Sequence, residues 1–231
     1  MAKQRTKIPR KKKDTIEDDT LLDLNEAKES AQGFFEKNQK MIVGIASLVA
    51  LLFIGYVVYQ FFYKEPREVA AKEMIYKAEQ QFLRDSFALA LENPGGGFEG
   101  FLDIIDNYSG TKTANLAKYY AGISYLNLGN NESAIEYLSS FSAAGQITPT
   151  MKNGAMGDAY SEMNDFDNAL SYYKKAAYGV ENELLSPYYL KKYAMLCEVQ
   201  GDNASAQKAY ATIKEKYPTS AEGADIDKYL N

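Results

Sequence analysis

The stretch NLAKYYAGISYLNLGNNESAIEYL, residues 115–138, carries the pattern that decides the fold of this chain. Its small and aromatic residues recur twice more at matching offsets. The three aligned sets are Ala121, Gly122, Tyr125, Gly129, Ala134 and Leu138; Met156, Gly157, Tyr160, Asn164, Ala169 and Tyr173; and Tyr193, Ala194, Cys197, Gly201, Ala206 and Tyr210. The periods are 35 residues, from Gly122 to Gly157, and 37 residues, from Gly157 to Ala194. Such a repeat predicts stacked supersecondary units.

Within each unit the pattern predicts two helices packed as a hairpin. A small residue in the middle of the first helix and another early in the second let the helix axes approach closely, and aromatic residues fill the space around them. The residues expected to make this packing are Gly122, Tyr125, Ala134, Gly157, Tyr160, Ala169, Ala194 and Ala206.

The turn between the two helices has its own signature. It requires a residue that tolerates positive φ, followed by a helix N-cap. The sequence supplies Gly129-Asn130, Asn164-Asp165 and Gly201-Asp202 at corresponding positions. Three separate turns therefore predict the same hairpin.

A period near 34 with two helices per unit resembles the tetratricopeptide repeat family over at least residues 115–220. The resemblance implies an all-α fold, with repeats at about 115–148, 150–183 and 187–220. All three lack the family's common Trp, and only the third has the closing proline, Pro218. These departures weaken the motif and leave the period unchanged.

The segments flanking the three repeats predict further helices. Residues 67–90 have an amphipathic helical pattern, and Glu99–Asn107 form another, so a degenerate first repeat is expected at about 67–110. Between them, Asn93–Gly97 (NPGGG) lacks the Lys-Ser/Thr of a phosphate-binding loop and is interpreted as an inter-helix loop. Ala221–Leu230 is predicted to be a solubilising cap helix.

Met41–Tyr63 is a run of 23 residues without a charged side chain. As a helix it would be about 35 Å long, enough for a hydrocarbon core of about 30 Å. A buried core helix or a cleaved signal peptide are the alternatives, but the length and the bulky aromatic residues at its end favour a retained anchor. We therefore predict a single transmembrane helix over 41–63, preceded by a charged tail over 1–40 and followed by a repeat domain over 64–231.

The tail over residues 1–40 holds 10 Lys/Arg and 8 Asp/Glu, whereas residues 64–231 hold 16 and 23. A short basic tail is more easily retained in the cytoplasm than a long acidic domain, so we predict a cytoplasmic N-terminus. Basic Lys11–Lys13 could contact anionic lipid or RNA, but acidic residues follow at once and no aromatic residues are interleaved. A largely disordered tail without a nucleic-acid partner is favoured, with a possible short amphipathic helix over Thr20–Phe35, capped by Thr20.

Most familiar active sites are excluded by composition, because the chain has no His and one Cys. Paired carboxylates such as Glu181 and Glu183 lie in polar stretches that do not predict a raised pKa. Cys197 occupies an inward repeat position and is interpreted as a core residue. The sequence thus predicts a non-enzymatic protein without a metal or cofactor.

Binding remains as the expected activity. The resemblance implies a concave groove lined by the first helix of each repeat, suited to apolar or basic extended segments. Its expected contact residues are Leu116, Tyr119, Ile123 and Asn127 in the first repeat, Met151, Asp158 and Glu162 in the second, and Tyr188, Lys191, Met195 and Glu198 in the third.

At the level of the whole chain, a charged tail with FFEKNQK (Phe34–Lys40), one span and a small repeat domain resemble the ancillary Sec-translocon subunit family of bacterial inner membranes. The resemblance implies periplasmic repeats beside the translocation channel and a membrane-anchored prolyl isomerase chaperone, where they assist exported polypeptides. Two other functions stay open: a membrane-anchored scaffold for another envelope assembly, such as outer-membrane biogenesis, secretion or cell division, and a regulator acting through its cytoplasmic tail. The sequence leaves the oligomeric state open.

Overall fold

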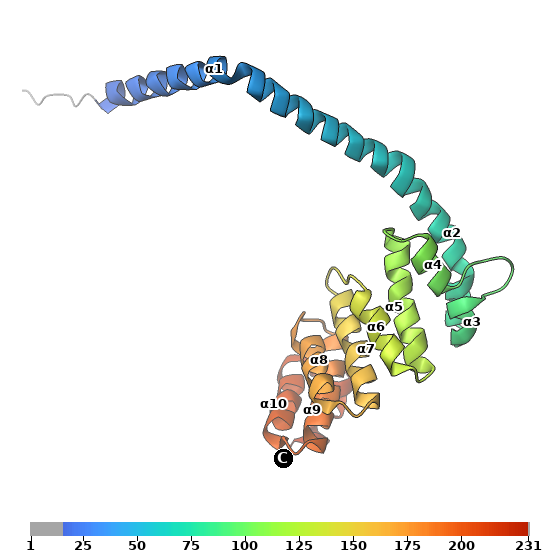
Figure 1. Ribbon diagram of the computed structural model, residues 1–231. Helices are drawn as coiled ribbons and strands as arrows, with labels where there is room; N and C mark the ends of the chain where they lie inside the picture. Colours follow the sequence, from blue (N-terminus) through green and yellow to red (C-terminus); the bar gives the residue numbers. More distant parts are fainter. Residues whose placement is uncertain (1–15, 231) are drawn as a thin grey trace, which may run out of the picture. The chain divides into compact units, whose positions relative to one another are not determined.

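The computed structural model describes the backbone of residues 16–230, and the side chains of residue 28 and residues 30–230 (Figure 1). The described part is all-helical. In chain order its elements are α1 (Ile16–Tyr59), a π-helical turn (Gln60–Lys64), α2 (Glu65–Phe82), α3 (Phe87–Glu92), α4 (Phe101–Asn107), α5 (Lys112–Asn127), α6 (Asn131–Ser140), α7 (Thr148–Glu162), α8 (Phe166–Tyr178), α9 (Leu185–Val199), α10 (Asn203–Lys216), α11 (Ala221–Ala224) and a 3₁₀ turn (Ile226–Tyr229).

The chain divides into two units, one ending at Gln60 and the other beginning at Phe61. The first contains α1. The predicted start of a short helix at Thr20 is wrong, because α1 is already helical at Ile16. The predicted tail spans residues 1–40, and its first 15 residues lie outside the described residues.

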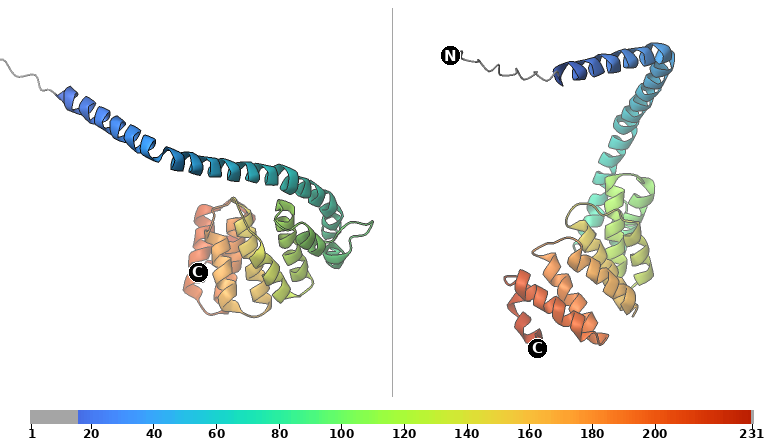
Figure 2. Two further views of the ribbon diagram at one scale, coloured as in Figure 1. Left: turned by 45° about the horizontal axis from the view of Figure 1, so that its top comes forward. Right: turned by 90° about the vertical axis from the view of Figure 1, so that its left-hand side faces the viewer.

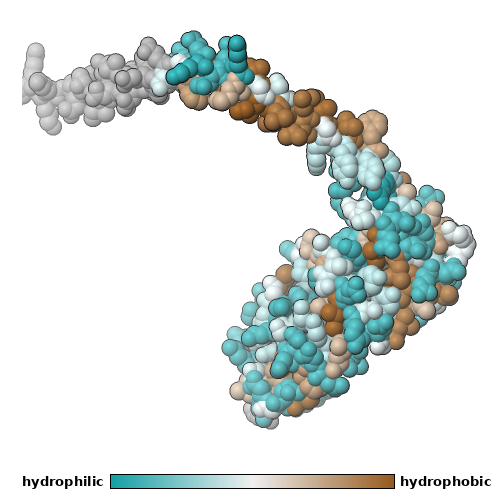
Figure 3. Space-filling view, in the orientation of Figure 1, coloured by the Kyte–Doolittle hydropathy of each residue, from teal (hydrophilic) through white to brown (hydrophobic). Residues whose placement is uncertain are grey.

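Apolar side chains in the second half of α1 are exposed along the helix. Leu51, Leu52 and Phe53 are each about two-thirds exposed, at 66%, 67% and 66%, and Figure 3 shows hydrophobic side chains gathered on this part of the helix. One helix in the described part of the chain is long and apolar enough to cross a membrane. Exposure of this kind is stable in hydrocarbon, where each backbone polar group is satisfied within the helix.

The second unit is a stack of helical hairpins, α5–α6, α7–α8 and α9–α10, lying side by side in chain order (Figures 1 and 2). The predicted turns are confirmed. Gly129, Asn164 and Gly201 have φ of 76°, 59° and 79°. The residue after each accepts a backbone hydrogen bond that caps the next helix; these caps are Asn130, Asp165 and Asp202.

Close approach of the paired helices rests on the small residues of the repeat. A Cβ added at Gly122 would lie 2.6 Å from Leu138 Cγ, and one at Gly157 would lie 2.5 Å from Tyr173 Cδ1. The alanines at the matching positions are fully buried; they are Ala134, Ala169, Ala194 and Ala206. Tyr125 and Tyr160 are half-buried and stack on Tyr137 and Tyr172, with ring centroids 5.4 and 5.3 Å apart.

The prediction of one helix over 67–90 is wrong. Helix α2 ends at Phe82, and the chain turns back into α3, with Asp85 at φ 56°. The Ser86 amide donates to the Gln81 carbonyl at 2.9 Å, which closes the helix end with a left-handed residue just before it. The Phe82 and Phe87 rings then pack in a T-shaped arrangement, with centroids 5.5 Å apart.

Charged residues at the start of α2 hold the neighbouring helices. The Glu68 carboxylate accepts hydrogen bonds from the Lys112 amide, at 2.6 Å, and from the Thr113 hydroxyl, at 2.9 Å, at the N-terminus of α5. Arg67 donates to the Asn107 carbonyl at the C-terminus of α4. Each charge thus lies at the helix end of opposite partial charge, which stabilises both helices.

The C-terminal segment differs from the predicted cap helix over Ala221–Leu230. It is divided into the four-residue α11 and the 3₁₀ turn, which meet at Asp225. Ile226 is buried at 2% exposure, and Tyr229 stacks on Tyr210 with centroids 5.0 Å apart. Packing of these two side chains on α10 bends the segment around the end of the hairpin stack.

Candidate protein-binding groove

A pocket with a volume of about 290 Å³ opens between α2, α5 and α7. We call it the aromatic pocket. Four predicted groove residues line it: Leu116, Tyr119, Ile123 and Met151. Four other residues complete it and were not foreseen from the sequence: Phe82, Tyr120, Phe141 and Thr148. None of these eight side chains carries a formal charge at neutral pH, so the pocket suits an apolar group.

Aromatic contacts fix the walls of the aromatic pocket. Tyr120 stacks on Phe101, with ring centroids 5.1 Å apart, and meets Phe82 at 4.9 Å. Tyr119 lies against Phe141 on the other side, at 5.4 Å. Such ring pairs add to the stability gained from burial alone. The walls are therefore formed before any ligand arrives.

Hydrogen bonds from two polar side chains fix the backbone at Phe141 and Ser142. The Asn115 amide donates to the Ser142 carbonyl at 3.0 Å and accepts from the Ser142 amide at 2.9 Å. Lys152 Nζ donates to the carbonyls of Phe141, at 2.7 Å, and Ser139, at 3.1 Å. Burial lowers the pKa of this amine. The sequence signal for Lys152 is weak: it is a basic residue next to the predicted groove residue Met151.

The second-repeat groove residues Asp158 and Glu162 line a different cavity, of about 330 Å³. Asp158 accepts hydrogen bonds from Tyr173 Oη and Lys192 Nζ, both at 2.6 Å. Asp158 therefore joins α7 to α8 and α9. Its partner Lys192 lies one residue beyond the predicted Lys191, and sequence reasoning missed it.

The remaining predicted groove residues line neither of these two cavities. Lys191 Nζ lies 5.4 Å from the centre of the Tyr229 ring. Glu198 accepts a hydrogen bond from Tyr210 Oη at 3.1 Å. The Asn127 amide donates to the Ile123 carbonyl in its own helix at 2.8 Å. Met195 is 47% exposed and Tyr188 is 42% exposed.

Cys197 is 1% exposed and lies in the core between α9 and α10. Burial raises the pKa of its thiol, with a smaller opposing effect from the Tyr193 hydroxyl. A raised pKa disfavours the thiolate, which is the nucleophilic form. Among the described residues, no group of three or more Cys, Asp and Glu is arranged to hold a metal ion.

The Tyr119 hydroxyl gives a pH-dependent prediction. Burial raises its pKa to about 12, with smaller contributions from Tyr120 and Asp158. Since the unfolded chain titrates near pH 10, the stability linked to Tyr119 is fully present below about pH 10 and is lost as the pH rises towards about 12. Spectrophotometric titration should show one tyrosinate step near pH 12 that Tyr119→Phe removes, while the later steps of the more strongly shifted Tyr173, Tyr189 and Tyr210 remain. Tyr76→Phe is the control, because Tyr76 is 55% exposed. Titration of Tyr119 together with the exposed tyrosines would contradict the prediction.

A family model of the tetratricopeptide repeat matches residues 116–143 and 192–220. The matched segments cover most of the first hairpin, α5–α6, and of the third, α9–α10. The middle hairpin shares their positive-φ turn and N-cap. No match among curated proteins was found. The fold is therefore all-helical with tetratricopeptide repeats and one N-terminal helix able to span a membrane.

Tetratricopeptide repeats mediate contacts between proteins, so the fold is that of a protein-binding module. Proteins of this class are generally scaffolds without catalytic activity, which agrees with the buried, deactivated thiol of Cys197. Protein partners are therefore the ligands that the repeat domain indicates.

Proposed function

We propose that this chain is a non-enzymatic accessory subunit of the bacterial Sec translocon. In this proposal α1 anchors the chain in the inner membrane, with its N-terminus in the cytoplasm and its repeats in the periplasm. The repeat groove assists newly exported polypeptides together with a membrane-anchored prolyl isomerase chaperone.

The aromatic pocket is the observation that carries this proposal. Exported chains emerge unfolded with their apolar side chains exposed, and a preformed apolar pocket binds one such side chain without first reorganising. Its volume of about 290 Å³ is at the small end for ligand sites and suits a single bulky side chain. Weak contacts of this kind favour many clients over one tight partner.

The uncharged stretch of α1 adds a second argument. A groove tethered beside the membrane meets an emerging chain at high effective concentration, so weak contacts suffice for useful occupancy. The architecture of tail, single span and repeats also resembles the ancillary Sec-translocon subunit family, which supports the inner-membrane location and the partners named above.

In-cell photo-crosslinking from a probe at Tyr119, in the aromatic pocket, tests the proposal. We expect adducts with Sec channel subunits, with a prolyl isomerase chaperone and with a spread of exported proteins, identified by mass spectrometry after detergent purification. Lys174, which is exposed on the second helix of its hairpin, is the matched control probe and should give few client adducts. One dominant envelope partner without Sec components would overturn the proposal in favour of a scaffold.

The variant Ile123→Glu sharpens the same experiment. A carboxylate in a pocket lined by uncharged side chains is costly to desolvate, so client adducts from a probe at Met151 should fall at least about fivefold. A retained melting temperature shows that the domain remains folded. If deleting residues 2–33 abolishes function while Ile123→Glu does not, the tail carries the function and the proposal fails.

A further inference from the structure

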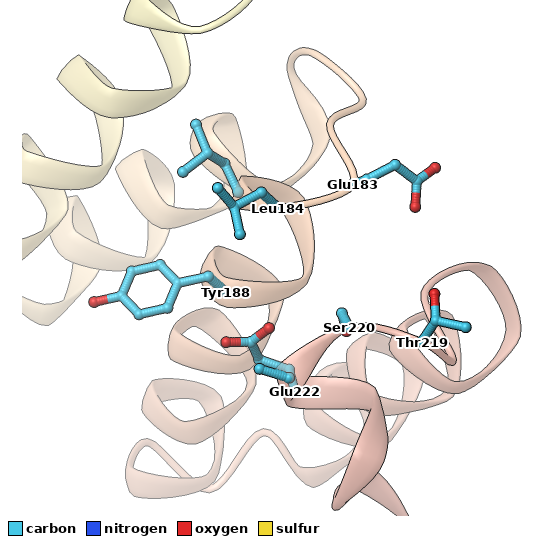
Figure 4. A pocket seen from close by; sticks show the side chains of 8 residues that line it. Glu183, Leu184, Tyr188, Thr219, Ser220 and Glu222 are labelled. Carbon is cyan, nitrogen blue, oxygen red and sulfur yellow. The ribbon is translucent and has the colours of Figure 1, made fainter.

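A further cavity lies between the start of α9 and α11, and Figure 4 shows it from close by. Its volume is about 630 Å³, within the usual range for ligand sites. Six of its lining residues bear on what it can bind: Glu183, Leu184, Tyr188, Ser220, Ala221 and Glu222. We call it the terminal cavity; it shares no lining residue with the aromatic pocket.

One wall of the terminal cavity is fixed by the turn that leads into α9. The Asn182 side-chain oxygen accepts hydrogen bonds from the amides of Leu184, at 3.0 Å, and Leu185, at 2.9 Å. The backbone N–H of Asn182 in turn donates a hydrogen bond to the hydroxyl of the fully buried Ser186, at 3.0 Å. Leu184 is 77% exposed although its backbone is held in this way.

The opposite wall is fixed by the turn between α10 and α11. The Ser220 hydroxyl donates to the Tyr217 carbonyl at 2.8 Å and accepts from the Gly223 amide at 2.9 Å. A Cβ added at Gly223 would stand 2.2 Å from the Tyr217 carbonyl oxygen, so glycine permits this close approach. Glu181, two residues before Glu183, also pairs with Lys216 of α10 at 3.1 Å. Both walls are therefore in place without a ligand, which lowers the entropic cost of binding.

The interior of the terminal cavity is apolar and open to solvent. Figure 4 shows Leu184 and Tyr188 on the α9 side of the cavity, and they are 77% and 42% exposed. Tyr189 meets the Tyr188 ring edge-on at 5.0 Å and supports it. An exposed leucine and tyrosine on rigid backbone offer apolar area at little further entropic cost when they bind.

Two acidic residues, Glu183 and Glu222, border this interior without a basic partner from the described part of the chain. The neighbouring carboxylates Glu181, Asp225 and Asp227 pair with Lys216, Lys228 and Lys214. Within the described part of the chain, Glu183 and Glu222 form no such ion pair. Lys192 lies 5.1 Å from the Tyr188 ring centre, but Asp158 holds its ammonium at 2.6 Å. The border of the terminal cavity is therefore negative.

We propose that the terminal cavity docks a basic, apolar segment of a partner protein. One bulky apolar side chain lies between Leu184 and Tyr188, and flanking Lys or Arg side chains pair with Glu183 and Glu222. This charge complementarity disfavours acidic peptides and anionic lipid headgroups. Of the predicted groove residues the terminal cavity contains Tyr188, but it lies at the other end of the repeat stack from the aromatic pocket, so it goes beyond the proposed client site.

Fluorescence anisotropy with the full-length protein in phosphatidylcholine nanodiscs tests the docking site. The probe is a fluorescein-labelled nine-residue peptide with one Phe flanked on each side by two Lys. We expect binding that weakens with added salt and that falls about fivefold to tenfold in the double variant Glu183→Gln/Glu222→Gln. Leu184→Ser should weaken binding without changing the salt dependence. The same peptide with Glu in place of Lys should not bind.

Two variants distinguish binding in the terminal cavity from binding elsewhere on the protein. Glu215→Gln removes an exposed carboxylate from α10 outside the cavity and should leave the affinity unchanged. Ile123→Glu changes the aromatic pocket and should not weaken binding of the peptide. A failure of the client proposal can therefore be told apart from a failure of the docking site. Equal affinity in the double variant, or no binding by the unmodified protein, would overturn the proposal. The proposal would also be overturned if the unmodified protein had the mass of a dimer and Leu184→Ser the mass of a monomer, since a second copy of the chain would then fill the cavity.

Discussion

Gly157→Leu should destabilise the repeat domain by about 1–3 kcal/mol through overpacking. A Cβ at this position would stand 2.5 Å from Tyr173 Cδ1 and 2.7 Å from Cε1, so the α7–α8 hairpin has to open before any further side-chain atoms can fit. Tyr173 is only 6% exposed and cannot move towards solvent without losing its contacts. Thermal unfolding of the full-length protein in detergent, followed by circular dichroism, should show a melting temperature lower by about 2–4 °C per kcal/mol.

Two further variants show whether the close approach of these helices is the cause. Gly157→Ala adds only the Cβ and should have a smaller effect in the same direction. Gly44→Leu makes the same exchange in α1, where nothing lies within 4 Å of the added atom, and should leave the repeat-domain transition unchanged. An unchanged melting temperature for Gly157→Leu would mean that the assigned repeat register is wrong.

Asp158→Ala should cost about 1–3 kcal/mol, the expected penalty for leaving partly buried hydrogen-bonding groups unpaired. The carboxylate accepts from Tyr173 and Lys192 at 2.6 Å each, and both members of its ion pair have side chains 30% exposed. Loss of the carboxylate leaves the Lys192 ammonium without its counter-charge and removes a tie between α7, α8 and α9. Urea unfolding of the full-length protein should show a lower midpoint with an unchanged slope.

Glu162→Ala is the matched control for Asp158→Ala, because it removes a carboxylate one turn further along α7. Glu162 is exposed and forms no ion pair within the part of the chain that the structure describes, so its removal should stay within about 0.5 kcal/mol. If the two variants were equally stable, Asp158 would be a free groove residue and not a structural tie. If Asp158→Ala alone loses stability, a loss of client binding in that variant has a structural cause.

The two carboxylates also show how far a repeat register predicts a binding site. Asp158 and Glu162 occupy neighbouring groove positions, and the sequence treats them alike. In the structure one is committed to Lys192 and the other remains exposed. The difference arises because Lys192 comes from α9, 34 residues further along the chain. Register thus places a side chain on a face of a helix, while partners from other helices decide whether it is available.

Leu116, Tyr119, Ile123 and Met151 are the predicted groove residues that line a single pocket in the structure. Leu116, Tyr119 and Ile123 lie on α5 and Met151 lies on α7, and the register assigned all four to the groove face. Phe82 and Phe141 complete that pocket from segments outside the aligned helices, and no periodicity points to them. Their positions depend on the turn after α2 and on the hydrogen bonds of Asn115 and Lys152.

The sequence by itself determined the features that depend on neighbouring residues. These are the uncharged span, the repeat period, and the three turns in which a positive-φ residue precedes an N-cap. Hydropathy, backbone freedom and capping act within a few residues, so they can be read along the chain. The tertiary structure alone decided the break at Asp85, the walls of the aromatic pocket and the acidic border of the terminal cavity. Each of these depends on free energies of packing and pairing between residues far apart in sequence, which no local pattern contains.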